Sequence, residues 1–473
     1  MMKRLFWLYT LLSLVGCTEV TIEDKVPTNS GEYHATIEEG NSRTYVDEQI
    51  RMRWTAEDRI TLFEKNTYNR TFMFTGKTGA NAGGFRKVST DDDYWFGYDV
   101  DANYAVYPHS DDNTLDETKL FLTVNMPAEQ TYAENSFGLG SNTMVAVSET
   151  GQLIFKNVGS YLRVCLYGYN TSVSSIILTT KGNEAIAGEA KVTPIINGNP
   201  TCEMTGTGKS IRLTCPTPVT ISSDANNPTD FWIVVPPVTL ANGFTVTVEN
   251  SDGNTQTYDV NKSFTFERNK YYDMVRELSK IIHVEKAGTL VSHLKGADQF
   301  YWRSLKIIGP LDGYDIMWIR NMLWGDDTNE PNSYSLRMLD LSEASIVESS
   351  TPYYADYCTS NNTIGEYMFY DCTGLISIIL PNGVTSIGPA AFSYRCCLEY
   401  VVLPSSLISI ASRAFSDWVS IKECYCHAII PPSLDSHAWN STAKDAKLYV
   451  PKGCVEAYEA SDWGHYFTNI EEM

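Results

Sequence analysis

Apolar residues recur every 23 positions in the C-terminal part of the chain, over residues 364–426. A strand with its return loop has one apolar face that it cannot bury alone, whereas stacked copies bury one another's faces. A period of about 20 to 29 residues with a Leu-x-x-Leu-x-Leu core predicts a leucine-rich solenoid. The recurring residues are Ile364, Ile387 and Ile410; Phe369, Phe392 and Phe415; Leu375, Leu398 and Ile421; and Leu380 and Leu403.

The same register continues on both sides of the regular repeats and predicts about six stacked strands. A short amphipathic helix over residues 315–322 and a short helix at residues 455–458, followed by Trp463, should cover the two ends, because uncovered ends leave apolar surface and strand edges exposed. The predicted inward positions are Leu305 and Ile307; Leu336, Leu339 and Leu341; Leu375, Ile378 and Leu380; Leu398, Val401 and Leu403; Ile421, Cys424 and Cys426; and Leu448 and Val450.

Residues 33–280 show a different pattern, in which apolar and polar side chains alternate over short runs such as 59–63 and 244–248. Gly, Asn, Asp and Pro separate the runs, and Asn197-Gly198 and Asp252-Gly253 are hairpin-turn signals. This pattern predicts an all-β region built from β-sandwiches. No Pro- or Gly-rich spacer precedes His283, so we expect this region to abut the repeat domain.

Charge narrows the classes of partner. The chain of 473 residues has 57 acidic and 36 basic side chains and a net charge of -21. The acids are spread along the sequence, and no Lys- or Arg-rich run offers a phosphate-binding patch. Such a protein repels nucleic acid and anionic lipid surfaces, so nucleic acid is not an expected partner.

The N-terminus carries a targeting pattern. Lys3-Arg4 is followed by an apolar run that is too short to span a bilayer. The run ends in Leu14-Val15-Gly16-Cys17, which resembles a bacterial lipobox and implies a signal peptide over residues 1–16 and a lipid on Cys17. Residues 17–32 are polar and mostly acidic, as expected of a flexible tether. Glu19, Glu23 and Asp24 resemble the surface-export signal of Bacteroidetes lipoproteins, which implies an outer-membrane anchor facing the cell exterior.

A series of motifs runs through residues 33–280 in a fixed order: Arg43-Thr44-Tyr45, Trp54, Asp58-Arg59-Ile60, Tyr104-Ala105-Val106-Tyr107-Pro108, Met126-Pro127-Ala128-Glu129-Gln130, Met144-Val145-Ala146, Leu153-Ile154-Phe155-Lys156-Asn157-Val158 and Val234-Val235-Pro236-Pro237. The series resembles the fimbrillin-like domains of Bacteroidetes surface lipoproteins. The resemblance implies two transthyretin-like β-sandwich subdomains, over residues 33–152 and 153–280.

Some fimbrillins are pilus subunits that lose a first strand after an arginine-directed cut and then receive a donated strand. Arg43, Arg51 and Arg53 are the candidate processing residues on this resemblance. The other interpretation makes them surface arginines of a β-hairpin. Here the β region runs directly into another domain, which argues against polymerisation.

The repeats carry motifs of their own, among them Ile387-Gly388-x-x-Ala391-Phe392, Leu339-Asp340-Leu341-Ser342-Glu343-Ala344 and Leu448-Tyr449-Val450-Pro451-Lys452-Gly453. They resemble the BspA-like leucine-rich repeats, and we expect a capped repeat domain over residues 283–473. Together the resemblances imply a lipid-anchored surface adhesion protein that presents the repeats to a host, microbial or glycan ligand. The alternative is a fimbria-associated tip or anchor subunit that contacts other fimbrial subunits.

Catalytic chemistry finds little support in the sequence. Cys424, Cys426 and His427 lack a second ligand pair with zinc-like spacing, so we expect buried thiols and no metal or other cofactor. The segment 206–210 ends like a phosphate-binding loop but has Glu203 where the motif needs Gly. Asp91, Asp92, Asp93, Asp99 and Asp101 are expected to be solvated acids. Disulfide pairing among Cys358, Cys372, Cys396 and Cys397 stays open, and no motif of an enzyme is found.

Overall fold

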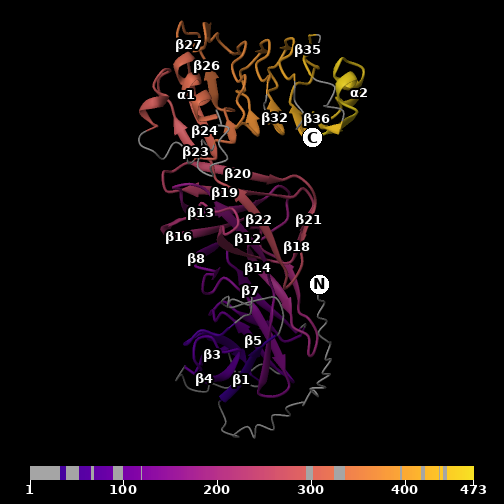
Figure 1. The fold of residues 1–473 in the computed structure, drawn as a ribbon. Coiled ribbons are helices and arrows are strands. Elements are labelled where there is room, and N and C mark those ends of the chain that lie inside the picture. Colours follow the sequence, from indigo (N-terminus) through magenta and orange to yellow (C-terminus); the bar gives the residue numbers. More distant parts are fainter. Residues whose placement is uncertain are drawn as a thin grey trace, which may run out of the picture.

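The computed structural model describes residues 32–38, 53–64, 69–88, 100–118, 120–294, 302–323, 336–394, 397–416, 421–435, 437–439 and 445–473. The protein is mainly β and elongated, with the repeat domain at one end and the N-terminal barrel at the other (Figure 1). In these residues no helix has both the length and the apolar character needed to cross a membrane.

The N-terminal part is a closed barrel, rather than the two-sheet sandwich predicted for it. Strand β1 closes it by pairing in parallel with β11 and antiparallel with β4. Trp54 is fully buried inside and meets the rings of Phe85 and Phe155 edge-on, at centroid distances of 5.0 and 5.3 Å. The barrel order is β1 (Glu32–Ile37), β11 (Gln152–Asn157), β10 (Met144–Ser148), β5 (Asn103–Tyr107), β2 (Arg59–Phe63), β3 (Asn69–Phe74) and β4 (Ala82–Lys87).

The division predicted near Leu153 does not separate the sheets. Strand β11 begins at Gln152 and belongs to the barrel, because its inward residues Leu153 and Phe155 are buried in the barrel core. Conversely, β6 (Thr114–Asp116), β7 (Phe121–Met126), β8 (Glu129–Ala133) and β9 (Ser136–Phe137) lie outside the barrel, in sheets that they share with later strands. Strand β7 is antiparallel to β14, and β8 is parallel to β16. The two parts of the β region are therefore interlocked.

The second part of the β region contains four sheets. They run β17-β12-β22, β20-β19-β13-β16-β8-β9, β15-β14-β7-β6 and β18-β21. Their remaining strands are β12 (Ser160–Tyr167), β13 (Ser172–Thr180), β14 (Gly188–Thr193), β15 (Thr201–Met204), β16 (Ser210–Thr220), β17 (Thr229–Val235), β18 (Val238–Leu240), β19 (Phe244–Asn250), β20 (Thr255–Val260), β21 (Phe264–Phe266) and β22 (Tyr271–Glu277).

The repeat domain is built on a ladder of parallel strands. Every inward position predicted from the 23-residue register is buried. Leu305, Leu339, Ile378, Val401, Cys424 and Leu448 lie in one row across the ladder. The ladder order is β23 (Lys280–His283), β24 (Ser304–Leu311), β25 (Met338–Asp340), β30 (Ser377–Ile379), β32 (Tyr400–Leu403), β34 (Glu423–Cys426), β36 (Lys447–Val450) and β37 (Asn469–Glu472), with β26 (Ala344–Ile346) pairing β24.

A second, shorter parallel ladder lines the loop side of the same repeats. It runs β29 (Thr363–Ile364), β31 (Ser386–Ile387), β33 (Ser409–Ile410) and β35 (Ser433–Leu434). Between the ladders the recurring rings of Phe369, Phe392 and Phe415 stack at centroid distances of 5.2 and 5.1 Å, and Trp439 continues the stack at 4.3 Å. The aromatic position of the repeat therefore forms a continuous column in the core.

Helices cover the ends of the ladder, as predicted. Helix α1 (Gly313–Leu323) packs Ile316 and Ile319 into the repeat core, and the Asp315 carboxylate accepts hydrogen bonds from the backbone N–H groups of Gly288 and Leu290 at 2.6 and 2.9 Å. These bonds join α1 to the 3-10 helix η1 (Leu290–Ser292). At the other end, α2 (Val455–Glu459) and α3 (Trp463–Tyr466) precede β37, and Trp463 is fully buried.

The two regions abut through a short connection, Leu278-Ser279, between β22 and β23. The side-chain amide of Gln256 accepts a hydrogen bond from the Ser279 N–H and donates one to the Ser279 carbonyl, both at 2.9 Å. The hydroxyls of Ser279 and Ser304 lie 2.6 Å apart, and His283 Nε2 lies 2.7 Å from Asn254 Oδ1. We call these contacts the joint, and they hold both sides of the connection.

Candidate ligand-binding surfaces

A cluster of tyrosines covers one side of the repeat domain, next to the hairpin of β27 (Pro352–Tyr354) and β28 (Tyr357–Cys358). Neighbouring ring centroids within it lie 5.2 to 6.3 Å apart. Tyr354 is 37% exposed, and Tyr357, Tyr367 and Tyr370 are half-buried. We call the cluster the tyrosine surface; its members are Tyr354, Tyr357, Tyr367, Tyr370 and Tyr394.

Arg320 holds the tyrosine surface in place through its guanidinium group. It lies on α1, and its guanidinium donates hydrogen bonds to the backbone carbonyls of Tyr367, Met368 and Tyr370 at 3.0, 2.7 and 3.1 Å. The same group lies 4.4 Å from the centroid of the Tyr354 ring, a cation–π contact. One side chain from the helix therefore sets the position of both the hairpin and the loop that carry the rings.

The charged groups beside the rings are mainly acids. Asp356 is exposed in the hairpin turn, and Asp371 follows Tyr370 directly. The carboxylate of Glu366 contacts the Tyr357 hydroxyl, and burial together with this carboxylate raises the pKa of Tyr357. Burial also raises the pKa of Tyr370. The hydroxyls of Tyr357 and Tyr370 are therefore neutral at physiological pH.

A groove with a volume of about 680 Å³ lies at the joint, between β20 and β22 on one side and the outward face of the ladder on the other. Several of its polar groups already have partners. Lys306 pairs with Glu343 at 2.5 Å and with Asp340 at 3.8 Å, while Gln256 holds Ser279. The groove lies between two domains, as many ligand sites do, but its Lys306 ammonium is already paired with two carboxylates.

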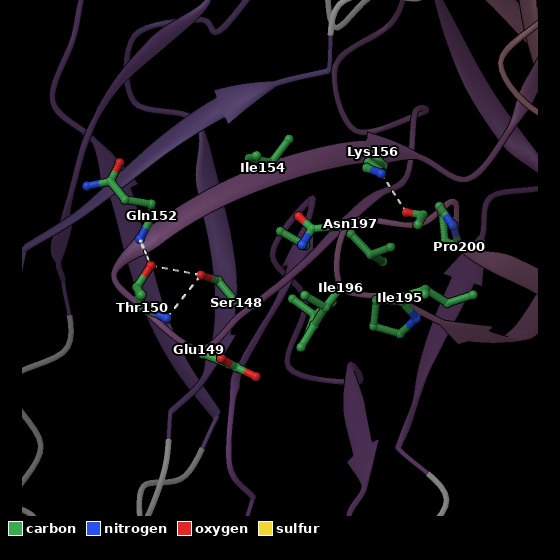
Figure 2. Close-up of a pocket in the computed structure, with 15 residues that line it drawn as sticks. Ser148, Glu149, Thr150, Gln152, Ile154, Lys156, Ile195, Ile196, Asn197 and Pro200 are labelled. Carbon is green, nitrogen blue, oxygen red and sulfur yellow. Dashed lines mark hydrogen bonds between the residues drawn. The ribbon is translucent and has the colours of Figure 1, made fainter. Parts of the chain in front are cut away.

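A smaller pocket of about 340 Å³ opens between the β10–β11 hairpin and the loop 194–200. Figure 2 shows Ile154 on the strand and Ile195 and Ile196 on the loop across from it. These three side chains are about half exposed. The ammonium group of Lys156 donates to the Gly198 carbonyl at 2.5 Å, so this cation is already committed (Figure 2). The lining of the pocket is therefore mixed, with polar and apolar groups in similar measure.

Of the sequence-predicted site residues, the structure describes Arg53 alone. Cys17, Arg43 and Arg51 lie outside the described residues. Arg53 directly precedes Trp54, whose N–H donates to the Ala80 carbonyl at 2.8 Å and whose own carbonyl accepts from the Gly79 N–H at 2.9 Å. A protease that cuts after Arg53 would have to release a fully buried tryptophan, so the structure disfavours this bond as a cutting point.

Cys424 and Cys426 behave as core residues, in agreement with the prediction. Cys424 and Cys426 are fully buried, and burial raises the pKa of both thiols. The Tyr458 hydroxyl lies 3.2 Å from Cys426 Sγ, and burial lowers the pKa of His427. No group of three or more His, Cys, Asp or Glu side chains in the described part of the chain could hold a metal ion.

The remaining candidate motifs form no binding site in the residues that the structure describes. Residues 206–210 lead directly into strand β16 rather than into a helix, so they lack the setting of a phosphate-binding loop. Asp101 is exposed, and Asp91, Asp92, Asp93 and Asp99 lie outside the described residues. Among the cysteines whose pairing was open, Cys358 is an exposed free thiol and Cys396 lies outside the described residues.

The tyrosine surface was missed by sequence reasoning. Its members do not share one position of the 23-residue repeat, because Tyr370 aligns with Ser393 and Tyr367 with Ala390. The available signal was a local enrichment of tyrosine over residues 353–370, at positions that the core pattern leaves unassigned.

Solved structures with limited similarity to this chain include two candidate cell adhesion proteins. The protein from Bacteroides ovatus has 14% identity over 52% of this chain and 91% of its own, with a TM-score of 0.33. The protein from Bacteroides uniformis has 18% identity over 52% and 93%, with a TM-score of 0.31. A fimbrial assembly protein from Parabacteroides distasonis has 12% identity over 52% and 90%, with a TM-score of 0.24. No curated protein matches the chain at a significant level.

A family model gives the firmest match. Residues 355–455 match the BspA type leucine rich repeat region, in six copies. The matched residues contain the regular repeats, the stacked phenylalanines and most of the tyrosine surface. On this match, the repeats in the C-terminal domain are leucine-rich repeats of the BspA type.

Proposed function

We propose that the protein is a lipid-anchored cell-surface adhesion protein, which uses its repeat domain to bind a ligand. The tyrosine surface is the observation that carries this proposal. Tyrosine and arginine are enriched in the residues that dominate binding energy at protein interfaces, because a ring offers a large contact area at a small entropic cost. Here neighbouring rings and Arg320 already hold the tyrosines in place.

The arrangement of the domains supports presentation away from a membrane. The chain enters the described structure at β1 in the barrel, and the repeat domain lies at the opposite end (Figure 1). A lipid on Cys17 and a tether over residues 17–32 would place the barrel nearest the outer membrane. The β region would then act as a fimbrillin-like stalk, and the repeats as a capped solenoid at its tip.

Protease shaving of intact cells tests the surface location. We expect added protease to remove residues 283–473 from living cells, while a periplasmic control protein stays intact. In a Cys17→Ala strain the chain should lose its lipid label and leave the membrane fraction. Protection of the repeat domain on intact cells, with exposed control proteins digested, would show that the proposed surface display is wrong.

The alternative function is a fimbria-associated tip or anchor subunit, and the position of β1 favours it. This strand lies between β4 and β11, so its removal after Arg43 or Arg51 would open a gap that a strand from another subunit could fill. The N-terminus of the mature protein distinguishes the two functions. A chain that begins at Thr44 or Met52 supports the fimbrial alternative, and one that begins at lipidated Cys17 supports the anchored adhesion protein.

A further inference from the structure

We propose that the tyrosine surface binds a cationic segment of a partner protein, in which arginine or lysine side chains pack against the tyrosine rings. This inference rests on the proposed function and specifies the chemistry of its ligand. Aromatic rings attract cations through their negative faces, and the attraction strengthens when the pair is desolvated. Four of the rings, those of Tyr354, Tyr357, Tyr367 and Tyr370, carry the argument.

The protein already contains one example of the contact on this surface. The guanidinium of Arg320 lies 4.4 Å from the centroid of the Tyr354 ring. Its three hydrogen bonds to the loop go to backbone carbonyls rather than to a carboxylate. The rings and carbonyls of this segment therefore provide a suitable environment for a guanidinium.

Charge complementarity selects the class of ligand. The acids beside the rings are Asp356, Glu366 and Asp371, and Glu366 is held against the Tyr357 hydroxyl. The chain as a whole carries a net charge of -21. A cationic partner is steered toward such a surface and pairs with its carboxylates, whereas an anionic partner is repelled.

The rings are also ordered before a ligand arrives. Tyr367 meets Tyr370 and Tyr357 at centroid distances of 5.2 Å in each case, and the buried Tyr353 anchors the hairpin by donating to the Glu366 carbonyl at 2.7 Å. Because the rotamers are already fixed, little side-chain entropy is lost on binding. The surface is therefore ordered for binding before a basic segment reaches it.

Binding of a charged peptide to the full chain tests the proposal. The probe is a fluorescein-labelled peptide with four Gly-Arg-Ser repeats, and its control has citrulline, a neutral analogue, in place of each arginine. We expect the citrulline peptide to bind at least about tenfold more weakly. Binding of the arginine peptide should weaken as NaCl is raised, because salt screens exposed charges. Binding of the arginine peptide should also slow the alkylation of Cys358, the exposed thiol of β28, and mass spectrometry measures this rate.

Variants locate the site. The double variant Tyr354→Ala/Tyr370→Ala should bind the arginine peptide at least about tenfold more weakly. Tyr370→Phe keeps the ring and should bind within about twofold of the wild type, since the hydroxyl plays no part in a cation–π contact. Tyr400→Ala, which alters an exposed tyrosine of strand β32, is the matched control and should have no effect. Thermal unfolding checks that each variant is folded.

Three outcomes overturn the inference: equal binding of the two peptides, no binding of either, or equal losses in the double variant and in Tyr400→Ala. A glycan array serves as a further arm. The protein could retain a neutral glycan, lose it only in the double variant and show no preference for the arginine peptide. That result would show that the proposed ligand class is wrong, while the adhesion function stands. Protection of the repeat domain in the shaving experiment would instead remove the proposed function itself.

Discussion

Substitution of Phe392 should strongly affect stability, because its ring lies between those of Phe369 and Phe415 in the core column. We expect Phe392→Ala to lower the free energy of unfolding of the repeat domain by about 3–5 kcal/mol, the usual cost of removing a fully buried phenylalanine. Urea denaturation measures the loss. Ile408→Ala removes a side chain that is 66% exposed and should change stability by less than about 0.5 kcal/mol. Similar effects of the two substitutions would contradict the stacked column.

Asp58 gives the barrel a dependence on pH. Its carboxylate accepts hydrogen bonds from the Thr55 N–H at 2.7 Å and the Tyr107 hydroxyl at 3.1 Å, and burial raises its pKa to about 6. Because the pKa is higher in the folded than in the unfolded state, the protonated carboxyl favours folding. The stabilisation that the protonated Asp58 carboxyl gives the folded state is complete below the ordinary pKa of an aspartate. It declines as the pH rises through about 6.

The variant Asp58→Asn should remove this dependence. Relative to the variant, the wild type is expected to lose stability between about pH 4 and 6 and to change little above pH 7. Thermal unfolding of both proteins across this range measures their difference in stability. The contributions of other titrating groups cancel in this difference. A constant difference between the two proteins would contradict the raised pKa.

At the residue scale, inward positions could be predicted and outward ones could not. The inward positions are not all leucine, yet the register correctly placed Cys424 and Cys426 in the core, because a parallel stack forces equivalent positions to face the same way. The same stack leaves outward side chains unconstrained. Tyr367 and Tyr370 therefore gave no periodic signal, although they belong to the surface with the clearest chemistry.

At the element scale, the ladder extends beyond its predicted ends. Strand β23 precedes the predicted array and β37 follows it, pairing Ile282 with Ile307 and Ile470 with Leu448. Neither strand has the Leu-x-x-Leu-x-Leu pattern, because a terminal strand packs against a neighbour on one side only. The barrel was also beyond prediction, since alternation indicates which side of a strand is buried but not whether a sheet closes.

Strand β1 closes the barrel, and its loss tests that role. A chain that begins at Arg53 lacks β1, so β4 and β11 lose their partner and the core around Phe85 and Leu153 is exposed. We expect a lower melting temperature and a tendency to associate through the open edges. A chain that begins at Ser30 keeps β1 and serves as the control.

A synthetic peptide of residues 30–39, added to the chain that begins at Arg53, should restore the melting temperature by refilling the gap. Stability that is unchanged by the truncation would mean that β1 is not needed to close the barrel. The experiment also measures how readily another strand is accepted at this position.

At the scale of the whole molecule, Gln256 controls how the two regions are held together. Gln256→Ala removes both hydrogen bonds to the partly buried Ser279, at a cost of about 0.5–1.5 kcal/mol for each bond. We expect small-angle X-ray scattering to show a broader range of overall dimensions, because the joint loosens. Gln152→Ala, an exposed glutamine of β11, is the matched control. An unchanged scattering profile would show that the remaining contacts hold the joint without Gln256.

The joint also determines how the protein would respond to tension. A ligand pulled at the tyrosine surface, against an anchor at the N-terminal end, loads the chain through the connection Leu278-Ser279. Strand β22 is paired along its length with β12, from Tyr271 to Glu277, and β23 is paired with β24. A pull along these strands loads their hydrogen bonds together in shear. The lifetime of an attachment under flow should then depend on the unfolding rate of these paired strands as well as on the affinity for the ligand.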